Sequence, residues 1–143
     1  ILVTGAAGFI GSHLVEKLFK DGYNLNLLVP YNVDNSWGWI DSLDEKIKNN
    51  VEIVSGDVCD QDLIGKITKD VNIIFHLAAL ISIPYSYVSP RSYISTNIIG
   101  TLNLLEALKN SNIDLFVNTS TELNSPLIKK AALSTALSFL GNT

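Results

Sequence analysis

The chain has 143 residues, the size of one domain, and 47% of them are apolar while 17% are charged, a balance that excludes intrinsic disorder. Its formal net charge is −4 at pH 7 with Lys and Arg scattered along the sequence, which argues against a nucleic-acid partner. The one cysteine, Cys59, excludes an internal disulfide and a paired-thiol metal clip, so we predict no metal site and a reducing, cytoplasmic setting.

Apolar runs of strand length alternate along the chain with stretches of helical periodicity, which is the pattern of strand, helix, strand units. Strands are predicted at residues 1–4, 24–30, 51–55, 71–77 and 113–118. Helices are predicted at residues 9–20, 39–48, 60–68 and 91–110. Because the strands are continuously apolar, both faces of the sheet should be covered. This predicts an α/β doubly wound parallel sheet in a single domain over residues 1–143.

Two of the predicted helices carry recognisable boundary residues. The helix over 9–20 is followed by Asp21-Gly22, a typical C-cap pair, and the helix over 91–110 begins after Ser89-Pro90. The second helix has an apolar stripe at helical spacing, which predicts the face that packs on the sheet. The stripe comprises Ile94, Ile98, Thr101, Leu102, Leu105 and Leu108, with Glu106 and Lys109 on the outer face.

Residues 71–90 form a run of 20 residues without Asp, Glu, Lys or Arg, about the length of a membrane helix. Pro84 lies within the run, and Asn72, His76 and Tyr85 add polar groups. We therefore predict a buried strand followed by a loop rather than a membrane-spanning helix.

Three glycines, Gly5, Gly8 and Gly11, lie between the first predicted strand and the first predicted helix. Glycine lets the backbone adopt positive φ and approach a ligand where a Cβ would stand in the way. The free N–H groups of the first helical turn and the positive end of the helix dipole favour an anion there by about 0.3–1 kcal/mol. This context predicts a pyrophosphate-binding turn, the alternative being a tight turn whose glycines serve packing alone.

The segment TGAAGFIGSHL, with the spacing G-x-x-G-x-x-G, resembles the cofactor loop of the extended short-chain dehydrogenase/reductase family, which contains the NAD-dependent nucleotide-sugar epimerases and dehydratases. Further stretches match this family in order, and the resemblance covers residues 1–122. They are Gly56-Asp57-Val58, His76-Leu77-Ala78-Ala79, Thr96-Asn97 with Gly100-Thr101, and Asn118-Thr119-Ser120-Thr121. The resemblance implies a Rossmann-like NAD(P)-binding domain.

The resemblance also implies which residues contact the dinucleotide. They are Gly5, Ala7, Gly8, Phe9, Ile10, Gly11, Asp57, Val58, Leu77, Ala78, Ala79, Asn97, Thr119 and Ser120. NAD-selective members end their second strand in an acid that binds the adenosine ribose, but that position falls near Val29, where neither an acid nor Arg occurs. Asp34, Asn32 and Asn35 are the alternatives on the following loop. NAD is the predicted cofactor, with NADP left open.

Two stretches, residues 31–43 and 76–90, resemble UDP-N-acetylglucosamine 4,6-dehydratases of the legionaminic-acid and bacillosamine type. By that resemblance, the enzyme oxidises carbon 4 of a UDP-N-acetylhexosamine, eliminates water across carbons 5 and 6, and returns the hydride to carbon 6. The resemblance places Ser82, Tyr85 and Ser86 beside the substrate. The alternatives are a sister nucleotide-sugar 4-epimerase and, for these side chains, a role in packing alone.

Catalytic roles are implied near the end of the chain. Thr121 matches the family's Ser/Thr that holds the sugar hydroxyl. Glu122 matches a carboxylate that takes part in the elimination of water, and Lys129 matches the Lys of Tyr-x-x-x-Lys. No Tyr follows Tyr93, and Ser125 stands where the catalytic Tyr belongs, so in this alignment the general base is lost. The alternative is that residues 123–143 form a surface helix.

The match to the family ends before residue 123, and the family's C-terminal substrate domain would follow residue 143. The sequence has no Met, and Ile1 already lies in a predicted strand, so we expect an amino-terminal piece or a degenerate copy of the enzyme. Two other functions stay open: an inert dinucleotide-binding module and a flavodoxin-like binder of FMN. The helix over 91–110 resembles a dimer-forming helix of the family, which implies a homodimer.

Overall fold

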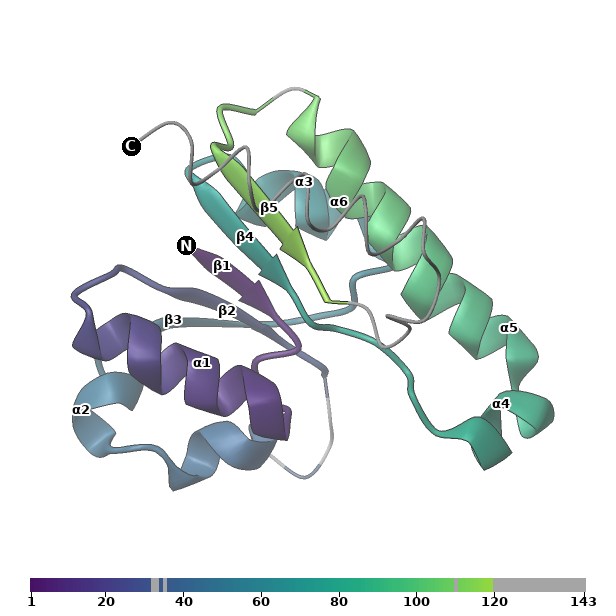
Figure 1. The fold of residues 1–143 in the computed structure, drawn as a ribbon, viewed down its shortest axis with the longest axis horizontal. Coiled ribbons are helices and arrows are strands. Elements are labelled where there is room, and N and C mark those ends of the chain that lie inside the picture. Colours follow the sequence, from purple (N-terminus) through teal and green to yellow (C-terminus); the bar gives the residue numbers. More distant parts are fainter. Residues whose placement is uncertain (32–33, 35, 110, 120–143) are drawn as a thin grey trace, which may run out of the picture.

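The computed structural model describes residues 1–31, 34, 36–109 and 111–119. Within them, five parallel strands form one sheet in the order β3-β2-β1-β4-β5 (Figure 1). The strands are β1 (Leu2–Thr4), β2 (Asn26–Val29), β3 (Glu52–Ser55), β4 (Ile73–His76) and β5 (Leu115–Asn118). The helices are α1 (Phe9–Lys20), the 3-10 helix η1 (Gly38–Ser42), α2 (Glu45–Lys48), α3 (Gln61–Ile67), α4 (Ile83–Val88), α5 (Pro90–Tyr93), the π-helix η2 (Ile94–Ile99) and α6 (Gly100–Leu108). The predicted α/β doubly wound fold is confirmed.

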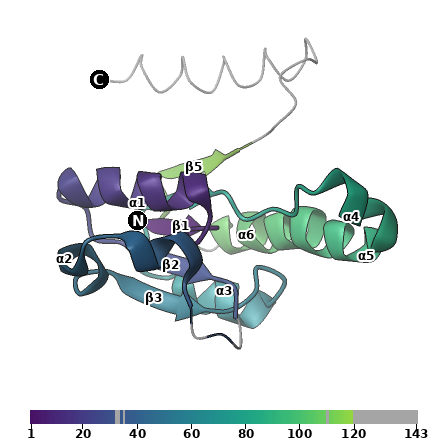
Figure 2. The same ribbon diagram turned by 90° about the horizontal axis from the view of Figure 1, so that it is seen from below.

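Helices cover both faces of the sheet, and α1 and α3 lie on opposite sides of it (Figures 1 and 2). The face under α1, η1 and α2 buries Val3, Ala6, Val15, Leu18, Leu25, Leu27, Val29, Ile40 and Ile47. The face under α3 and α6 buries Leu2, Leu28, Val58, Ile64, Val71, Ile74 and Leu104. Successive strand residues therefore feed opposite cores, which is why each strand reads as continuously apolar.

The register of the strands brings their carboxyl ends to one edge of the sheet. Thr4, the last residue of β1, pairs with Leu28 of β2 on one side and with His76 of β4 on the other. His76 in turn pairs with Asn118 of β5. The chain runs outward from β1 to β2 and β3 in one direction and from β4 to β5 in the other, so the strand order reverses between β1 and β4. Doubly wound sheets bind ligands at this reversal.

α1 has the predicted bounds and ends as its sequence indicates. Gly22 has φ of 88°, its N–H donates to Phe19 O at 3.0 Å, and the N–H of Tyr23 donates to Leu18 O at 3.2 Å. These two bonds form a Schellman motif, which requires a left-handed residue and therefore favours glycine.

The prediction of one helix over 39–48 is wrong. The structure has the short η1 and α2 separated by Leu43, whose φ of −73° and ψ of 157° are extended. Asp44 then caps α2 by accepting a hydrogen bond from the Lys46 N–H at 2.7 Å. An Asp that competes for backbone donors in this way starts a new helix, and periodicity alone does not reveal that break.

The prediction of a loop after the fourth strand is also wrong in part, because α4 lies there. Pro84 stands in the first turn of α4, where its missing N–H costs no hydrogen bond. No helix among the described residues is long and apolar enough to cross a membrane.

The helix predicted over 91–110 is present as α5, η2 and α6, but the predicted packing face is wrong. Leu104 and Asn103 face the sheet, whereas four residues of the predicted stripe are largely exposed. These four are Ile94, Ile98, Leu102 and Leu105. Within α6 the buried residues are Gly100, Asn103 and Leu104, and at about 100° per residue Leu102 and Leu105 lie on the opposite side of the helix.

Candidate functional site

The glycine loop between β1 and α1 is built for close backbone approach. Gly5 has φ of 70°, and a Cβ on it would lie 2.7 Å from Ala78 N, in the segment that follows β4. A Cβ on Gly11 would lie 2.8 Å from Ala6 Cα and closer still to the carbonyl oxygen of Gly5. The N–H of Gly8 donates to Gly5 O at 3.1 Å and closes the turn. At Gly5 and Gly11, therefore, only glycine fits without moving backbone.

The amino end of α1 is open to an anion. Gly8 is its N-cap residue, no side chain caps this helix, and its first turn carries no acid. Phe9 and Ile10, the first two helical residues, are both mostly exposed. Their N–H groups have no acceptor one turn back, so the partial positive charge of this helix end faces outward.

The segment after β4 forms the other side of the predicted site and is fixed by polar contacts. The N–H of Leu77 donates to Thr4 O at 3.2 Å, so this segment continues beside β1. Asn97 of η2 holds the Leu80 main chain at both ends: its Oδ1 accepts from Leu80 N at 2.8 Å and its Nδ2 donates to Leu80 O at 2.9 Å. Asn97 is therefore bonded to the residue that follows residues 77–79, the other part of this segment that the resemblance assigned to the cofactor.

Asp57 and Val58 lie just beyond β3, and Val58 packs against α6. A Cβ on Gly100 would lie 3.0 Å from Val58 Cβ, and Asn103 Nδ2 donates to Val58 O at 3.0 Å. The Asp57 carboxylate accepts a hydrogen bond from the Cys59 N–H at 2.9 Å. Burial, followed by the neighbouring Asp57, raises the pKa of the Cys59 thiol to about 11, so this cysteine is a protonated, half-buried side chain at neutral pH.

Sequence reasoning missed a contact between η1 and the glycine loop. The Trp39 N–H donates to Ala7 O at 3.0 Å, and the rings of Trp39 and Phe9 meet edge to face at 5.2 Å. Gly38 has φ of 61°, and a Cβ on it would lie 2.7 Å from Ala7 O. The Ala7–Gly8 peptide is thus bonded at both its carbonyl and its N–H, which fixes its orientation. The available signal was a glycine between two tryptophans, in the segment Trp37-Gly38-Trp39.

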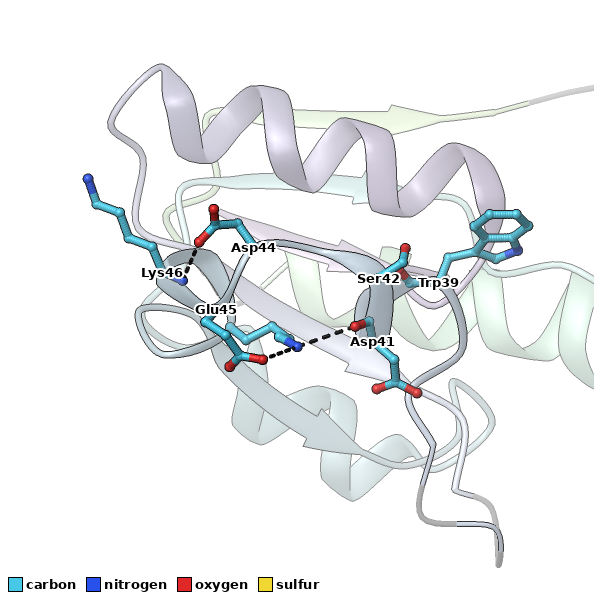
Figure 3. Close-up of polar contacts among 7 residues, drawn as sticks. Trp39, Asp41, Ser42, Asp44, Glu45 and Lys46 are labelled. Carbon is cyan, nitrogen blue, oxygen red and sulfur yellow. Dashed lines mark hydrogen bonds and ion pairs between the residues drawn. The ribbon is translucent and has the colours of Figure 1, made fainter.

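A hollow of about 300 Å³ lies beside the glycine loop, between α1 and the η1 segment, rather than at the strand ends. It is lined by Phe9, Ser12, His13, Glu16, Trp39, Ser42, Leu43 and Asp44. Figure 3 shows that polar groups of this segment bond to one another: Asp44 accepts from the Lys46 N–H, and Lys48 joins Glu45 to Asp41 O. We assign no ligand to this hollow.

The three residues predicted beside the substrate lie at and within α4, away from the glycine loop. Ser82 is the N-cap residue of α4, and its carbonyl oxygen accepts from the Tyr93 hydroxyl. Ser86 Oγ donates to Ile83 O at 2.7 Å, so its hydroxyl is engaged within the helix. Tyr85 is half exposed and faces the Tyr93 ring at 6.3 Å. Their substrate role stays a prediction.

The predicted catalytic residues Thr121, Glu122 and Lys129 lie outside the described residues, as do Ser120, Asn32 and Asn35. Thr119 is the last predicted site residue that the structure describes. Its N–H and its hydroxyl both donate to His76 O, at 3.2 and 3.1 Å, which ties the end of β5 to the end of β4.

Comparisons with known proteins find relatives that match the chain from β1 to just beyond β5. The sequence model of the family described as GDP-mannose 4,6 dehydratase matches residues 2–123. The UDP-glucose 4-epimerase of Mycolicibacterium smegmatis is 38% identical over 122 residues, covering 84% of this chain and 38% of that protein. The structure of UDP-glucose 4-epimerase with UDP-glucose from Thermotoga maritima is 34% identical, with a TM-score of 0.71 over 84% of this chain and 37% of that one. MoeE5 in complex with UDP-glucose and NAD is 29% identical, with a TM-score of 0.68 over 87% of this chain and 37% of that one.

The matched region includes every described part of the predicted cofactor site, from the glycine loop to Thr119. The chain spans between 36% and 38% of the length of the Mycolicibacterium smegmatis epimerase and of two other curated relatives that it matches.

Proposed function

The chain belongs to the GDP-mannose 4,6-dehydratase-like, NAD-dependent epimerase/dehydratase family, and we propose that its glycine loop binds the pyrophosphate of NAD in an enzyme that acts on a UDP-sugar. One observation carries the proposal. The loop at the strand-order reversal leaves no room for side chains at Gly5 and Gly11, and it leads into a helix whose amino end no side chain caps. A diphosphate bridge is the ligand group that such a turn accommodates.

The residues present fit the dinucleotide. The N–H groups of Phe9 and Ile10 would face the pyrophosphate, and Ala78 and Asn97 belong to the segments that would lie on the nicotinamide side. Bound NAD would supply a hydride acceptor and donor, while the protein would orient it and exclude water. MoeE5 in complex with UDP-glucose and NAD, which shares this fold, supports NAD over NADP.

The substrate class we propose is a UDP-sugar oxidised at carbon 4. Resemblance in residues 31–43 and 76–90 favours a 4,6-dehydratase acting on a UDP-N-acetylhexosamine. The similarity to UDP-glucose 4-epimerases favours the sister reaction, inversion at carbon 4. Thr121, Glu122 and Lys129 remain the proposed catalytic residues. The alternative is a dinucleotide-binding module without turnover, which the lack of a Tyr between Tyr93 and residue 143 favours.

Calorimetric titration of the 143-residue chain with NAD, NADP and FMN tests the binding proposal. Ile10→Glu places a carboxylate in the first turn of α1, which stabilises a helix but repels a pyrophosphate, so NAD affinity should fall about tenfold without loss of thermal stability. Ile10→Gln has the same shape without the charge and should bind as the parent does. Saturable binding of FMN but not of NAD would contradict the proposal.

Incubation with NAD and either UDP-N-acetylglucosamine or UDP-glucose separates the activities. A 4-keto-6-deoxy product identifies the dehydratase, and UDP-galactose identifies the epimerase. Absence of both products from a chain that binds NAD would indicate the dinucleotide-binding module instead.

We also propose that the chain forms a homodimer through the exposed apolar side of η2 and α6. Ile94, Ile98, Leu102 and Leu105 lie at helical spacing on that side, and together they make an apolar stripe that no described residue covers well. Ile98→Asp should lower the molar mass seen in sedimentation equilibrium to that of one chain. A parent chain that sediments as a monomer at high concentration would contradict the dimer.

A further inference from the structure

His76, the last residue of β4, is a buried polar residue that the proposed function leaves without a role. The residue is 2% exposed. Its ring lies between two hydroxyls: Nδ1 is 2.7 Å from Thr4 Oγ1 on β1, and Nε2 is 3.0 Å from Thr101 Oγ1 on α6. Each hydroxyl makes a further hydrogen bond, and those outer bonds determine which ring nitrogen carries the proton.

The Thr101 side places a proton on Nε2. Thr101 Oγ1 lies 2.8 Å from the carbonyl oxygen of Asn97. Because a carbonyl oxygen only accepts, the single hydroxyl proton of Thr101 is donated to it. Toward the ring, Thr101 Oγ1 can therefore only accept, and His76 Nε2 must donate.

The Thr4 side leaves Nδ1 without a proton. The Ala78 N–H donates to Thr4 Oγ1 at 3.3 Å, and the hydroxyl proton of Thr4 has no other acceptor among the bonds of the described residues than His76 Nδ1. A neutral imidazole protonated on Nε2 offers Nδ1 as an acceptor. Every bond in the series then points the same way, from the Ala78 amide through Thr4, His76 and Thr101 to the Asn97 carbonyl.

We propose that His76 is a positioning residue that, as the neutral Nε2–H tautomer, completes this one-way hydrogen-bond chain and so fixes the segment after β4 beside Gly5. Its importance for NAD affinity depends on the proposed function, whereas the hydrogen-bond chain itself does not.

The two ends of the hydrogen-bond chain meet the same short segment. Ala78, at the start, supplies the backbone nitrogen that would lie 2.7 Å from a Cβ on Gly5. Asn97, at the end, holds the Leu80 main chain with its side chain. In the opposite tautomer, Nε2 and Thr101 Oγ1 would face each other with no proton between them, and the Thr4 proton would lose its acceptor.

The surroundings of the ring favour the neutral form. Burial lowers the pKa of His76 below its ordinary value. The groups that face the ring from β1, α6 and β5 are Thr4, Thr101 and Phe116, the last with its ring centre 6.1 Å away. None of the three is titratable, so no neighbouring charge offsets the effect of burial.

Nitrogen-15 NMR of the imidazole in the 143-residue chain without ligand measures the tautomer directly. At about pH 7.5, well above the ordinary histidine pKa, His76 should show a protonated Nε2 and an unprotonated Nδ1. A protonated Nδ1, or a ring that exchanges between both neutral forms, would overturn the proposal.

Paired variants test the direction of the chain. Thr101→Ser keeps the hydroxyl and should keep the Nε2–H signature, whereas Thr101→Val removes the acceptor of Nε2 and should give a mixture of tautomers. Thr4→Val removes the acceptor of the Ala78 amide, whose hydrogen exchange should become at least about tenfold faster, while Thr4→Ser should preserve its protection. If a valine variant does not fold, the serine variants and the parent still decide: loss of the Nε2–H signature in Thr101→Ser would contradict the proposal.

Titration of the same variants with NAD measures the effect on the cofactor. Thr101→Val should bind NAD more weakly than Thr101→Ser, by a factor of several. Equal NAD affinity in this pair would overturn the positioning role. If no form of the chain binds NAD, the proposed function is wrong, but the NMR measurement of the His76 tautomer still tests the hydrogen-bond chain independently.

Discussion

The first strand, helix, strand unit, residues 1–29, and the helical arm, residues 81–99, show two different ways in which apolar sequence is used. In the first unit, the apolar side chains of β1 and β2 are buried, and so are Val15 and Leu18 of α1. In the arm, α4, α5 and η2 contain no buried residue, and Tyr87 is 84% exposed. The arm also extends beyond the end of the sheet in both views (Figures 1 and 2).

The arm is held in position by side-chain hydrogen bonds to main-chain atoms, whereas the first unit is held by burial of apolar side chains. Asn97 bonds both polar groups of Leu80, and the Tyr93 hydroxyl donates to Ser82 O. These contacts fix where the arm leaves β4 without requiring an apolar neighbour. An apolar stripe at helical spacing therefore indicates a helix, but it does not identify what the stripe packs against.

The largest effect should come from shortening a buried side chain of the first unit. Leu27→Ala should lower the free energy of unfolding by about 2–5 kcal/mol, because Leu27 is wholly buried and its loss leaves a cavity. Ile98→Ala, in the arm, should change it by less than about 0.5 kcal/mol at concentrations too low for the proposed dimer, because Ile98 is 60% exposed in the single chain. Urea denaturation measures both.

Protein concentration provides the control for this pair. If the loss of unfolding free energy caused by Ile98→Ala rises with protein concentration, a second copy of the chain covers the arm. A cost equal to that of Leu27→Ala at every concentration would contradict the contrast between the two regions.

A smaller loss should follow from adding one methyl group to the glycine loop. Gly11→Ala puts a Cβ against the backbone of Gly5 and Ala6, which cannot move independently, so stability should fall by about 1–3 kcal/mol. Gly65→Ala is the matched control: Gly65 lies within α3 with nothing within 4 Å of the added Cβ, and the change should stabilise the chain by about 0.5–1 kcal/mol. Thermal denaturation of both variants is the measurement, and a Gly11→Ala chain as stable as the parent would show that the loop is loose.

Stability should also depend on pH through His76, which contacts Thr4 of the first unit and Thr101, two residues beyond the arm. Because burial lowers its pKa in the folded chain below the 6.5 of an ordinary histidine, the unfolded chain takes up the proton first as pH falls. This contribution is fully present above about pH 6.5 and declines below it, at up to about 1.4 kcal/mol per pH unit, until the folded ring is protonated. Urea denaturation as a function of pH measures the slope. His76→Asn should remove the pH-dependent slope, and His13→Gln, which changes an exposed side chain of α1, should retain it. An unchanged slope in His76→Asn would show that other groups cause it.

The sequence predicted the first unit well and the arm poorly for physical reasons. The five parallel strands and α1 could be predicted because continuous apolar runs, the glycine cluster and the Asp21-Gly22 end are local signals. The break at Leu43 and the π-helical turns of η2 depend on competing backbone hydrogen bonds, to which periodicity is blind.

The candidate site divides in the same way. The glycine loop could be predicted from the sequence because a predicted strand and a predicted helix flank it. The contact from Gly38 to Ala7 could not, because it joins residues more than thirty positions apart and has no local pattern. The directed hydrogen bonds around His76 likewise depend on β1, β4 and α6 meeting at one edge, which only the register of the sheet reveals.

Asn97→Ala should have a small effect on global stability, although its local effect should be clear. The variant loses two hydrogen bonds to Leu80, but the freed groups lie near the surface and can bond to water, so the free energy of unfolding should fall by about 1 kcal/mol or less. Hydrogen exchange at the Leu80 amide should nevertheless accelerate, because the segment after β4 is held there by the Asn97 side chain. Asn97→Asp keeps the acceptor for that amide and loses only the donor, so it should protect Leu80 better than Ala does. If both variants exchange as slowly as the parent, apolar packing rather than this polar clamp holds the arm, and the contrast with the first unit disappears.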